Sequence, residues 1–89
     1  ANMAESYEIN VAPHNFYGHL ASCMSAQFCA AIPNFRIMEI EADDVPWKDD
    51  LVSTPPVIEN GEMRVPKAPG WGADVNEEAV RAHPPKQAR

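Results

Sequence analysis

The sequence predicts an α/β fold in which a strand–helix–strand (βαβ) unit over residues 1–41 precedes an irregular, proline-rich tail over residues 42–89. Two apolar runs, one ending at Val11 and one over residues 35–40, flank a segment whose apolar residues have helical spacing. Most of the nine prolines lie from Pro46 onward, and an Asn-Gly pair among them predicts a β-hairpin. We therefore expect two parallel strands joined by one helix, followed by a tail with a hairpin and a short helix.

The first strand is predicted over residues 7–12, after a helix-compatible segment at residues 1–6. Alternation along the strand places Ile9 and Val11 on one face and His14 on the opposite one. Pro13 has no amide donor and restricts the preceding residue to extended geometry, so the strand should end there. His14 is therefore expected at the carboxyl end of a strand.

The helix is predicted over residues 19–32, and Pro33 should end it. Its apolar face is expected to contain Leu20, Cys23, Met24, Gln27, Phe28 and Ala31. The second strand is predicted over residues 35–40. It is apolar on both faces apart from Arg36 and Glu39, which is typical of parallel strands that are covered on both sides.

The tail contains three local signals. Two short extended arms surround Asn60-Gly61, a strong signal for a two-residue hairpin turn. Residues 69–72 predict another turn, and Asn76 is expected to cap a short helix over residues 77–81, whose acidic first turn suits the helix dipole. Trp47 and Trp71 are expected to anchor the tail through apolar contacts.

Length and charge restrict the class of protein. Eighty-nine residues allow one small domain, and a net charge of −6 without a basic block argues against a nucleic-acid or anionic-membrane partner. No apolar run approaches the roughly 18 residues of a membrane span, and we expect a cytoplasmic protein. The chain opens on Ala1 rather than methionine, so we expect either a trimmed initiator or the end of a longer protein.

Several residues that could suggest a metal site are better explained otherwise. Cys23 and Cys29 lack metal-ligand spacing and are expected to be buried, reduced thiols. His19 and His83 are expected on the surface. The acidic residues of the tail lack the spacing and glycine of a calcium loop and are expected to form a solvated acidic loop; they include Asp43, Asp44, Asp49 and Asp50.

Two polar residues at the strand ends are the candidate catalytic residues. His14 is either a polar loop residue or a proton-transfer group, and its place at a strand end favours the second. Glu39 lies among apolar residues, where an unpartnered carboxylate is costly to bury. A pair with Arg36 is disfavoured because alternation puts the two on opposite faces, although Glu39 could also be solvated at the strand end. Asn15 could orient a substrate or cap the helix.

The order of these short motifs resembles the C-terminal end of the mandelate racemase/muconate lactonizing branch of the enolase superfamily, and most closely its galactonate-type sugar-acid dehydratases. The resemblance covers nearly the whole chain. The motifs that carry it are Pro13-His14-Asn15, Gly18, Pro33-Asn34-Phe35, Glu39, Glu59-Asn60-Gly61, the strand at residues 63–66, Pro69-Gly70-Trp71-Gly72 and the helix start at residues 74–78. Relatives often have proline at the position of His19.

The resemblance implies that residues 1–41 are the end of a (β/α)8 barrel, contributing its last two strands. It implies an acid-sugar substrate and a dehydratase, racemase or epimerase reaction, in which a proton is removed next to a carboxylate and Mg2+ stabilises the enediolate. His14 would be the general acid or base, Glu39 would hydrogen-bond the substrate carboxylate or enediolate, and Asn15 would contact substrate. The metal ligands would lie on strands outside these 89 residues, so this chain alone is expected to bind no magnesium and to be inactive.

The resemblance also implies that the complete enzyme is a homo-oligomer, as family members often are. The alternative interpretation is a non-enzymatic α/β interaction module, a relic of the barrel end that assembles with other chains.

Overall fold

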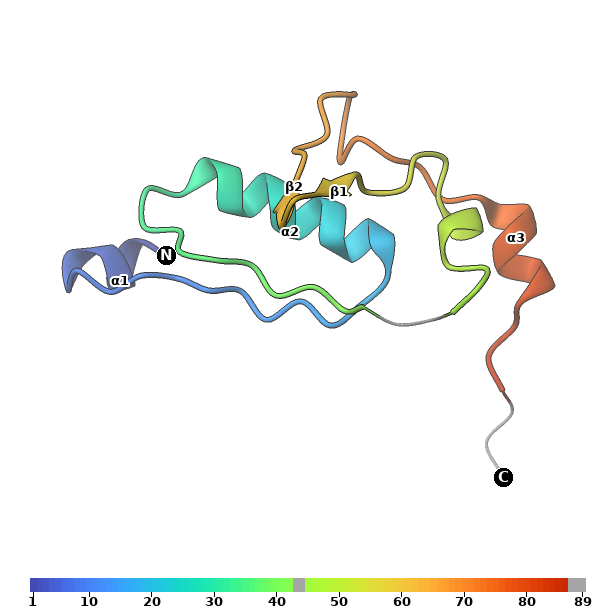
Figure 1. Ribbon diagram of the computed structural model, residues 1–89, viewed down its shortest axis with the longest axis horizontal. Coiled ribbons are helices and arrows are strands. Elements are labelled where there is room, and N and C mark those ends of the chain that lie inside the picture. The colour runs from blue at the N-terminus through green and yellow to red at the C-terminus, as the bar shows by residue number, and fades with distance from the viewer. Residues whose placement is uncertain (43–44, 87–89) are drawn as a thin grey trace.

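The computed structural model describes residues 1–42 and 45–86. Asp43 and Asp44 of the expected acidic loop lie outside the described residues. The described elements are helix α1 (Asn2–Ser6), helix α2 (His19–Ala31), the 3-10 helix η1 (Asp49–Leu51), strands β1 (Ile58–Glu59) and β2 (Glu62–Met63), and helix α3 (Glu77–Ala82). Two extended segments run along one side of α2, and the hairpin overlaps α2 in the view of Figure 1.

Helix α1 ends in a tight turn that shortens the predicted first strand. The amide of Ile9 donates to the carbonyl of Ala4, and the amide of Glu8 donates to that of Glu5, each at 2.9 Å. These two bonds form a Schellman motif, which needs a left-handed residue at its centre. Glu8 occupies that position with φ 57°. The prediction of a strand beginning at residue 7 is therefore wrong, because residues 7 and 8 complete the helix end.

The two predicted strands pair in parallel, but over one bridge only, Val11 with Phe35. The Val11 amide donates to the carbonyl of Asn34 at 2.8 Å, and the Arg36 amide donates to that of Val11 at 2.9 Å. At Pro13 there is no amide to continue the ladder. The Pro13 carbonyl instead accepts from Glu39 at 3.2 Å, one residue beyond regular register. The continuous strands predicted over residues 7–12 and 35–40 are thus replaced by extended segments with a bulge.

Helix α2 matches the predicted helix to within one residue, but its buried face is narrower than expected. The buried residues are Ser22, Cys23, Ala26 and Cys29, whereas Met24 and Phe28 are exposed. Both cysteines are free and buried, as predicted, and burial raises the pKa of each thiol.

The tail is joined to itself and to α2 by contacts between residues distant in sequence. Val52 and Val75 form an antiparallel bridge that brings η1 close to α3. The Gln27 side-chain amide donates to the carbonyl of Pro66 at 2.7 Å, which links α2 to the segment after the hairpin. Sequence patterns gave no signal for these contacts.

The local motifs of the tail lie where the sequence places them. Asn60 and Gly61 have φ of 52° and 75°, as a type I′ turn requires, and they join β1 to β2. The Asn76 side chain accepts from the Ala79 amide at 3.3 Å and caps α3.

The two tryptophans, expected to pin the tail against the strand–helix–strand unit, differ in their surroundings. Trp47 stacks on His83 with ring centroids 4.3 Å apart, so the expectation that His83 is fully exposed is wrong. The His83 ring is also fixed by its Nδ1, which donates to the carbonyl of Ala79 at 3.0 Å. Trp71 is 47% exposed, so about half of its surface is covered.

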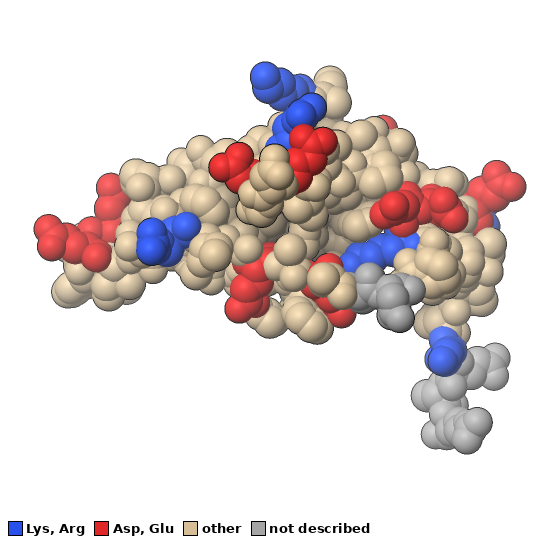
Figure 2. Space-filling view, in the orientation of Figure 1, with Lys and Arg blue, Asp and Glu red and all other residues tan. Residues whose placement is uncertain are grey.

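The surface carries no gathering of basic side chains on the face shown in Figure 2, where lysines and arginines lie apart from one another. Within residues 1–42 and 45–86, no helix is long and apolar enough to cross a membrane.

Candidate functional site

His14 and Glu39 meet at the carboxyl end of the paired segments. His14 Nδ1 lies 2.5 Å from Glu39 Oε2. The contact follows from the backbone, because the bulge bond from the Glu39 amide to the Pro13 carbonyl sets the glutamate directly beside the histidine. The structure therefore brings together the two side chains that sequence reasoning selected separately.

The chemistry of the pair depends on which nitrogen carries a proton. A carboxylate only accepts hydrogen bonds, so His14 Nδ1 is the donor in this contact. A neutral imidazole with its proton on Nδ1 has a free lone pair on Nε2, which can accept a proton from another molecule. The side chains of His14 and Glu39 are 68% and 56% exposed, so both can be reached from solvent. The arrangement can act as an acid–base pair at a surface.

Two aromatic side chains that the sequence patterns did not indicate, Phe16 and Tyr17, flank His14. The Phe16 ring is parallel to the imidazole with centroids 6.1 Å apart, and the Tyr17 ring is edge-on at 6.3 Å. Both rings are more than half exposed. Because both follow His14 within three residues, a search of the loop after the strand for aromatics would have found them.

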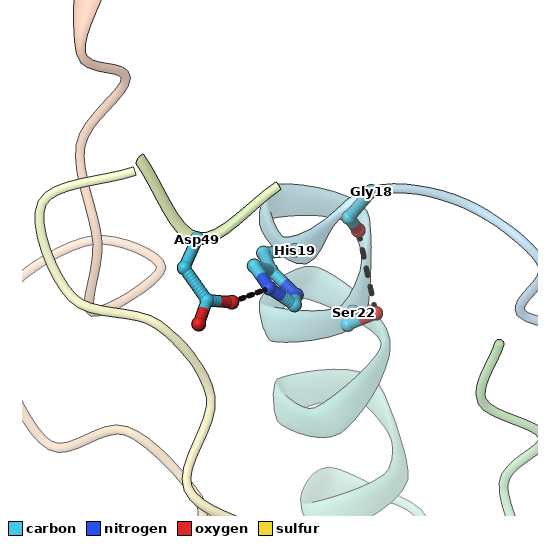
Figure 3. Close-up of polar contacts among 4 residues, drawn as sticks. All are labelled: Gly18, His19, Ser22 and Asp49. Carbon is cyan, nitrogen blue, oxygen red and sulfur yellow. Dashed lines mark hydrogen bonds and ion pairs between the residues drawn. The ribbon is translucent and has the colours of Figure 1, made fainter. Parts of the chain in front are cut away.

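Asn15 lies beneath this surface rather than on it. Its side chain is 1% exposed, and its Nδ2 donates to Ser22 Oγ at 3.0 Å. Ser22 Oγ in turn donates to the carbonyl of Gly18 at 3.3 Å (Figure 3). Gly18 is the N-cap of α2, and no side chain caps this helix, so the capping alternative for Asn15 is wrong. Asn15 Oδ1 is buried without a partner. Its role toward a substrate stays a prediction.

His19 is not the surface residue that the sequence suggested. Its Nε2 donates to Asp49 Oδ1 at 2.5 Å, as Figure 3 shows, and its side chain is only 16% exposed. The contact ties the first turn of α2 to η1. Asp49 is thus not part of a wholly solvated loop, although its own side chain remains exposed.

Comparison with known proteins identifies the family. The family described as enolase C-terminal domain-like matches residues 1–79. The chain belongs to this family. Among the enolase-type relatives, the D-xylonate dehydratase of Haloferax volcanii is 40% identical over 83 residues, which are 93% of this chain and 20% of that protein. The D-gluconate dehydratase of Thermoproteus tenax is 35% identical over 88 residues, which are 94% of this chain and 18% of that protein.

Solved structures of enolase-superfamily proteins share the backbone of this chain. A Burkholderia xenovorans protein described as an L-alanine-DL-glutamate epimerase, bound to magnesium and fumarate, is 53% identical with a TM-score of 0.92. The match covers 96% of this chain and 21% of that one. A mandelate racemase/muconate lactonizing enzyme from Labrenzia alexandrii is 34% identical with a TM-score of 0.81, over 93% of this chain and 21% of that one. The predicted relation to this branch and to sugar-acid dehydratases is confirmed. The chain spans about a fifth of the length of these relatives.

Magnesium, which one enolase-superfamily neighbour contains, does not fit the described residues. Residues 1–42 and 45–86 contain no group of three His, Cys, Asp or Glu side chains that could hold a metal ion. The His14–Glu39 pair offers one carboxylate and an imidazole, whereas Mg2+ prefers octahedral oxygen ligands. The pair by itself therefore does not have the ligand set of a magnesium centre.

Proposed function

We propose that this chain contributes the acid–base part of an enolase-superfamily active site that acts on a sugar acid. In this proposal residues 1–41 supply the last two strands of a (β/α)8 barrel. The observation that carries the proposal is the contact between His14 Nδ1 and Glu39 Oε2, made at the carboxyl ends of two parallel segments. Sites in parallel barrels form at that end of the strands. The two dehydratases among the relatives act on D-xylonate and D-gluconate by name, which favours an acid-sugar substrate.

In the proposed reaction His14 removes, or returns, the proton on the carbon atom that carries the substrate carboxylate. Glu39 accepts from Nδ1 and keeps Nε2 free to take up or return that proton. To donate a hydrogen bond to the substrate carboxylate or the enediolate, Glu39 needs a proton, which His14 Nδ1 would pass to it as Nε2 takes up the substrate's proton. Magnesium, where a family member binds it, supplies charge stabilisation to such an anion.

The proposal extends to proton removal and not to the step after it. Loss of a neighbouring hydroxyl gives dehydration, whereas return of the proton to the other face gives epimerisation. Relatives of this chain are named as dehydratases and as an epimerase. In our proposal both reactions begin with the proton removal that we assign to His14.

A chimeric enzyme tests the role of the pair. The matching 83-residue segment of the Haloferax volcanii D-xylonate dehydratase is replaced by this chain, and magnesium-dependent dehydration of D-xylonate is measured. We expect His14→Gln to lower kcat by about 10²- to 10⁴-fold, the usual contribution of a general acid or base. Glu39→Gln should also lower kcat.

The matched control is His83→Gln, which changes a histidine outside the site. Thermal unfolding of each chimera separates loss of chemistry from loss of fold. A His14→Gln chimera that is folded and as active as its parent would contradict the proposal. If the parent chimera is inactive, exchange of the substrate's proton with solvent deuterium still reports the first step, and its absence in a folded, substrate-binding chimera also counts against the assignment.

The isolated chain provides the complementary test. Because its described residues do not hold the metal, the 89-residue protein with magnesium should not dehydrate any acid sugar. Turnover by the pure chain would show that the acid–base pair needs no further residues. In that case the proposed division of the active site would be wrong.

A further inference from the structure

The tip of the hairpin combines an asparagine with a following glycine in an open position. Asn60 and Gly61 are both exposed, and both have left-handed backbones with φ of 52° and 75°. Apart from Gly61 itself and its two chain neighbours, no heavy atom lies within 4 Å of the point where a Cβ on Gly61 would be. The side of Gly61 where a Cβ would lie is therefore open. The Asn60 carboxamide and the Gly61 amide nitrogen are the two groups that can react with each other here.

We propose that Asn60 is a site of spontaneous covalent modification, in which its side-chain amide is converted to a carboxylate through a succinimide. The Gly61 amide nitrogen loses its proton to solvent base and bonds to Asn60 Cγ. The Cγ–Nδ2 bond then breaks, and Nδ2 leaves as ammonia after taking up a proton. Water next adds to one of the two ring carbonyls, the bond from that carbon to the ring nitrogen breaks, and the nitrogen takes up a proton: breaking the bond to Cγ gives aspartate, and breaking the bond to the backbone carbonyl carbon gives isoaspartate. No oxidant or further reactant is needed.

The hairpin restrains this reaction, and the structure shows that the restraint is weak. While β1 and β2 are paired, the turn fixes Asn60 and Gly61 in left-handed conformations, so we expect the ring to form faster when the hairpin opens. Each strand has only two residues. Glu59 and Glu62 are directly opposite in the register, and like charges in that position destabilise the pairing. Arg64 approaches Glu59 only to 3.8 Å and at the surface, where such a pair contributes little.

The product would weaken the hairpin further. A third carboxylate would lie between those of Glu59 and Glu62, and isoaspartate would add a methylene to the backbone of a two-residue turn. The hairpin is one wall of an open groove of about 510 Å3 whose other walls are α2 and residues 35–40. Ile58 and Met63 line this groove from the hairpin side. Modification of Asn60 is therefore expected to loosen that wall.

Peptide mapping of the full chain, incubated at mildly alkaline pH in water labelled with oxygen-18, tests the proposal. Asn60 should gain the mass of amide-to-acid conversion with one labelled oxygen, and should yield both aspartate and isoaspartate. The five other asparagines, none of which precedes glycine, are internal controls and should react far more slowly: Asn2, Asn10, Asn15, Asn34 and Asn76. Conversion of Asn60 no faster than theirs would overturn the proposal.

Two variants separate hairpin opening from the chemical step. Glu62→Lys turns a repulsive cross-strand pair into an attractive one and should slow conversion about fivefold, equivalent to about 1 kcal/mol. Glu78→Lys makes the same charge change in α3 and should leave the rate unaltered. Gly61→Ala should slow conversion although it weakens the turn, because the added methyl group hinders the attacking nitrogen. Equal rates for the two lysine variants would refute control by the hairpin, and an unchanged rate in Gly61→Ala would refute the succinimide route.

Discussion

Gly72 is the position where a single added methyl group should do the most damage to the tail. Gly72 is buried and has φ of 85°. A Cβ added there would lie 2.1 Å from Pro66 Cβ and 3.3 Å from Pro66 Cα. Neither atom belongs to a flexible side chain, and Pro66 is also held by the bond between its carbonyl and the Gln27 amide. The clash can therefore be relieved only by moving the backbone.

Two independent terms set the magnitude for Gly72→Ala. The left-handed backbone costs an L-residue about 1–2 kcal/mol. Overpacking against a rigid neighbour typically adds about 1–3 kcal/mol. Together they predict a loss of about 2–5 kcal/mol in the free energy of unfolding, which is comparable to the whole stability that a core of this size usually supplies.

Gly70→Ala is the matched control, because Gly70 has φ of 66° but no atom within 4 Å of its Cβ position. Gly70→Ala should therefore lower the free energy of unfolding only by the cost of the left-handed backbone, about 1–2 kcal/mol. Urea unfolding followed by circular dichroism, with hydrogen exchange of the Gln27 side-chain amide as a local measure, compares the two variants. A double-mutant cycle with Pro66→Gly, which removes the clashing Cβ, should recover the packing term. Equal losses for the two alanine variants, or no recovery in the cycle, would refute the packing argument.

Three further predictions concern other parts of the chain. Glu8→Gly should stabilise α1 by roughly 1 kcal/mol in urea unfolding, because glycine adopts the left-handed position of the Schellman motif without strain. Asp49→Asn should lower stability by about 1 kcal/mol, because it weakens the hydrogen bond from the largely buried His19 ring. Burial raises the pKa of the Cys23 and Cys29 thiols above 9.0, so alkylation of the folded chain should be slow. The contribution of this shift to the free energy of unfolding should be complete below pH 9.0 and should be lost as the pH rises through the folded-state pKa.

Each of these three predictions has a control and an outcome that would contradict it. Glu5→Gly, within α1, should destabilise where Glu8→Gly stabilises, and the same sign for both would contradict the Schellman assignment. Asp50→Asn alters the next carboxylate of η1, and a loss equal to that of Asp49→Asn would show that the pair with His19 is not responsible. For the thiols, alkylation in the folded chain as fast as in denaturant would contradict their burial.

The parts of the fold that were predictable are those encoded within a few residues. Pro33 ends α2 because of its own ring, and Asn60-Gly61 supplies the two left-handed residues that the hairpin turn requires. Asn76 caps α3 with its own side chain. The first strand was predicted too early because residues that look extended in sequence were needed to close α1. The left-handed conformation of Glu8 follows from the helix end and not from its residue type.

The candidate site shows the same division between local and long-range information. His14 and Glu39 were predicted as separate candidates because each lies at the end of a predicted strand. The two side chains meet because parallel segments have their carboxyl ends side by side. The burial of Asn15 depends on Ser22, one turn inside α2, and nothing in the sequence around Asn15 reports that partner. The same holds for His19, whose partner Asp49 is 30 residues away.

Two features of the described residues lead to the same conclusion about the proposed site. The segment at residues 35–40 is apolar on both faces, a pattern that is stable when a parallel strand is covered on both sides, yet Ile37 is 64% exposed and Phe35 is 42% exposed. The His14–Glu39 pair is likewise exposed, and within residues 1–42 and 45–86 no group of three potential metal ligands is present. The relatives that share this backbone are about five times longer. In the proposed chimera the rest of the dehydratase would supply both a cover for the segment at residues 35–40 and carboxylates for a metal, so the chimera tests the two together.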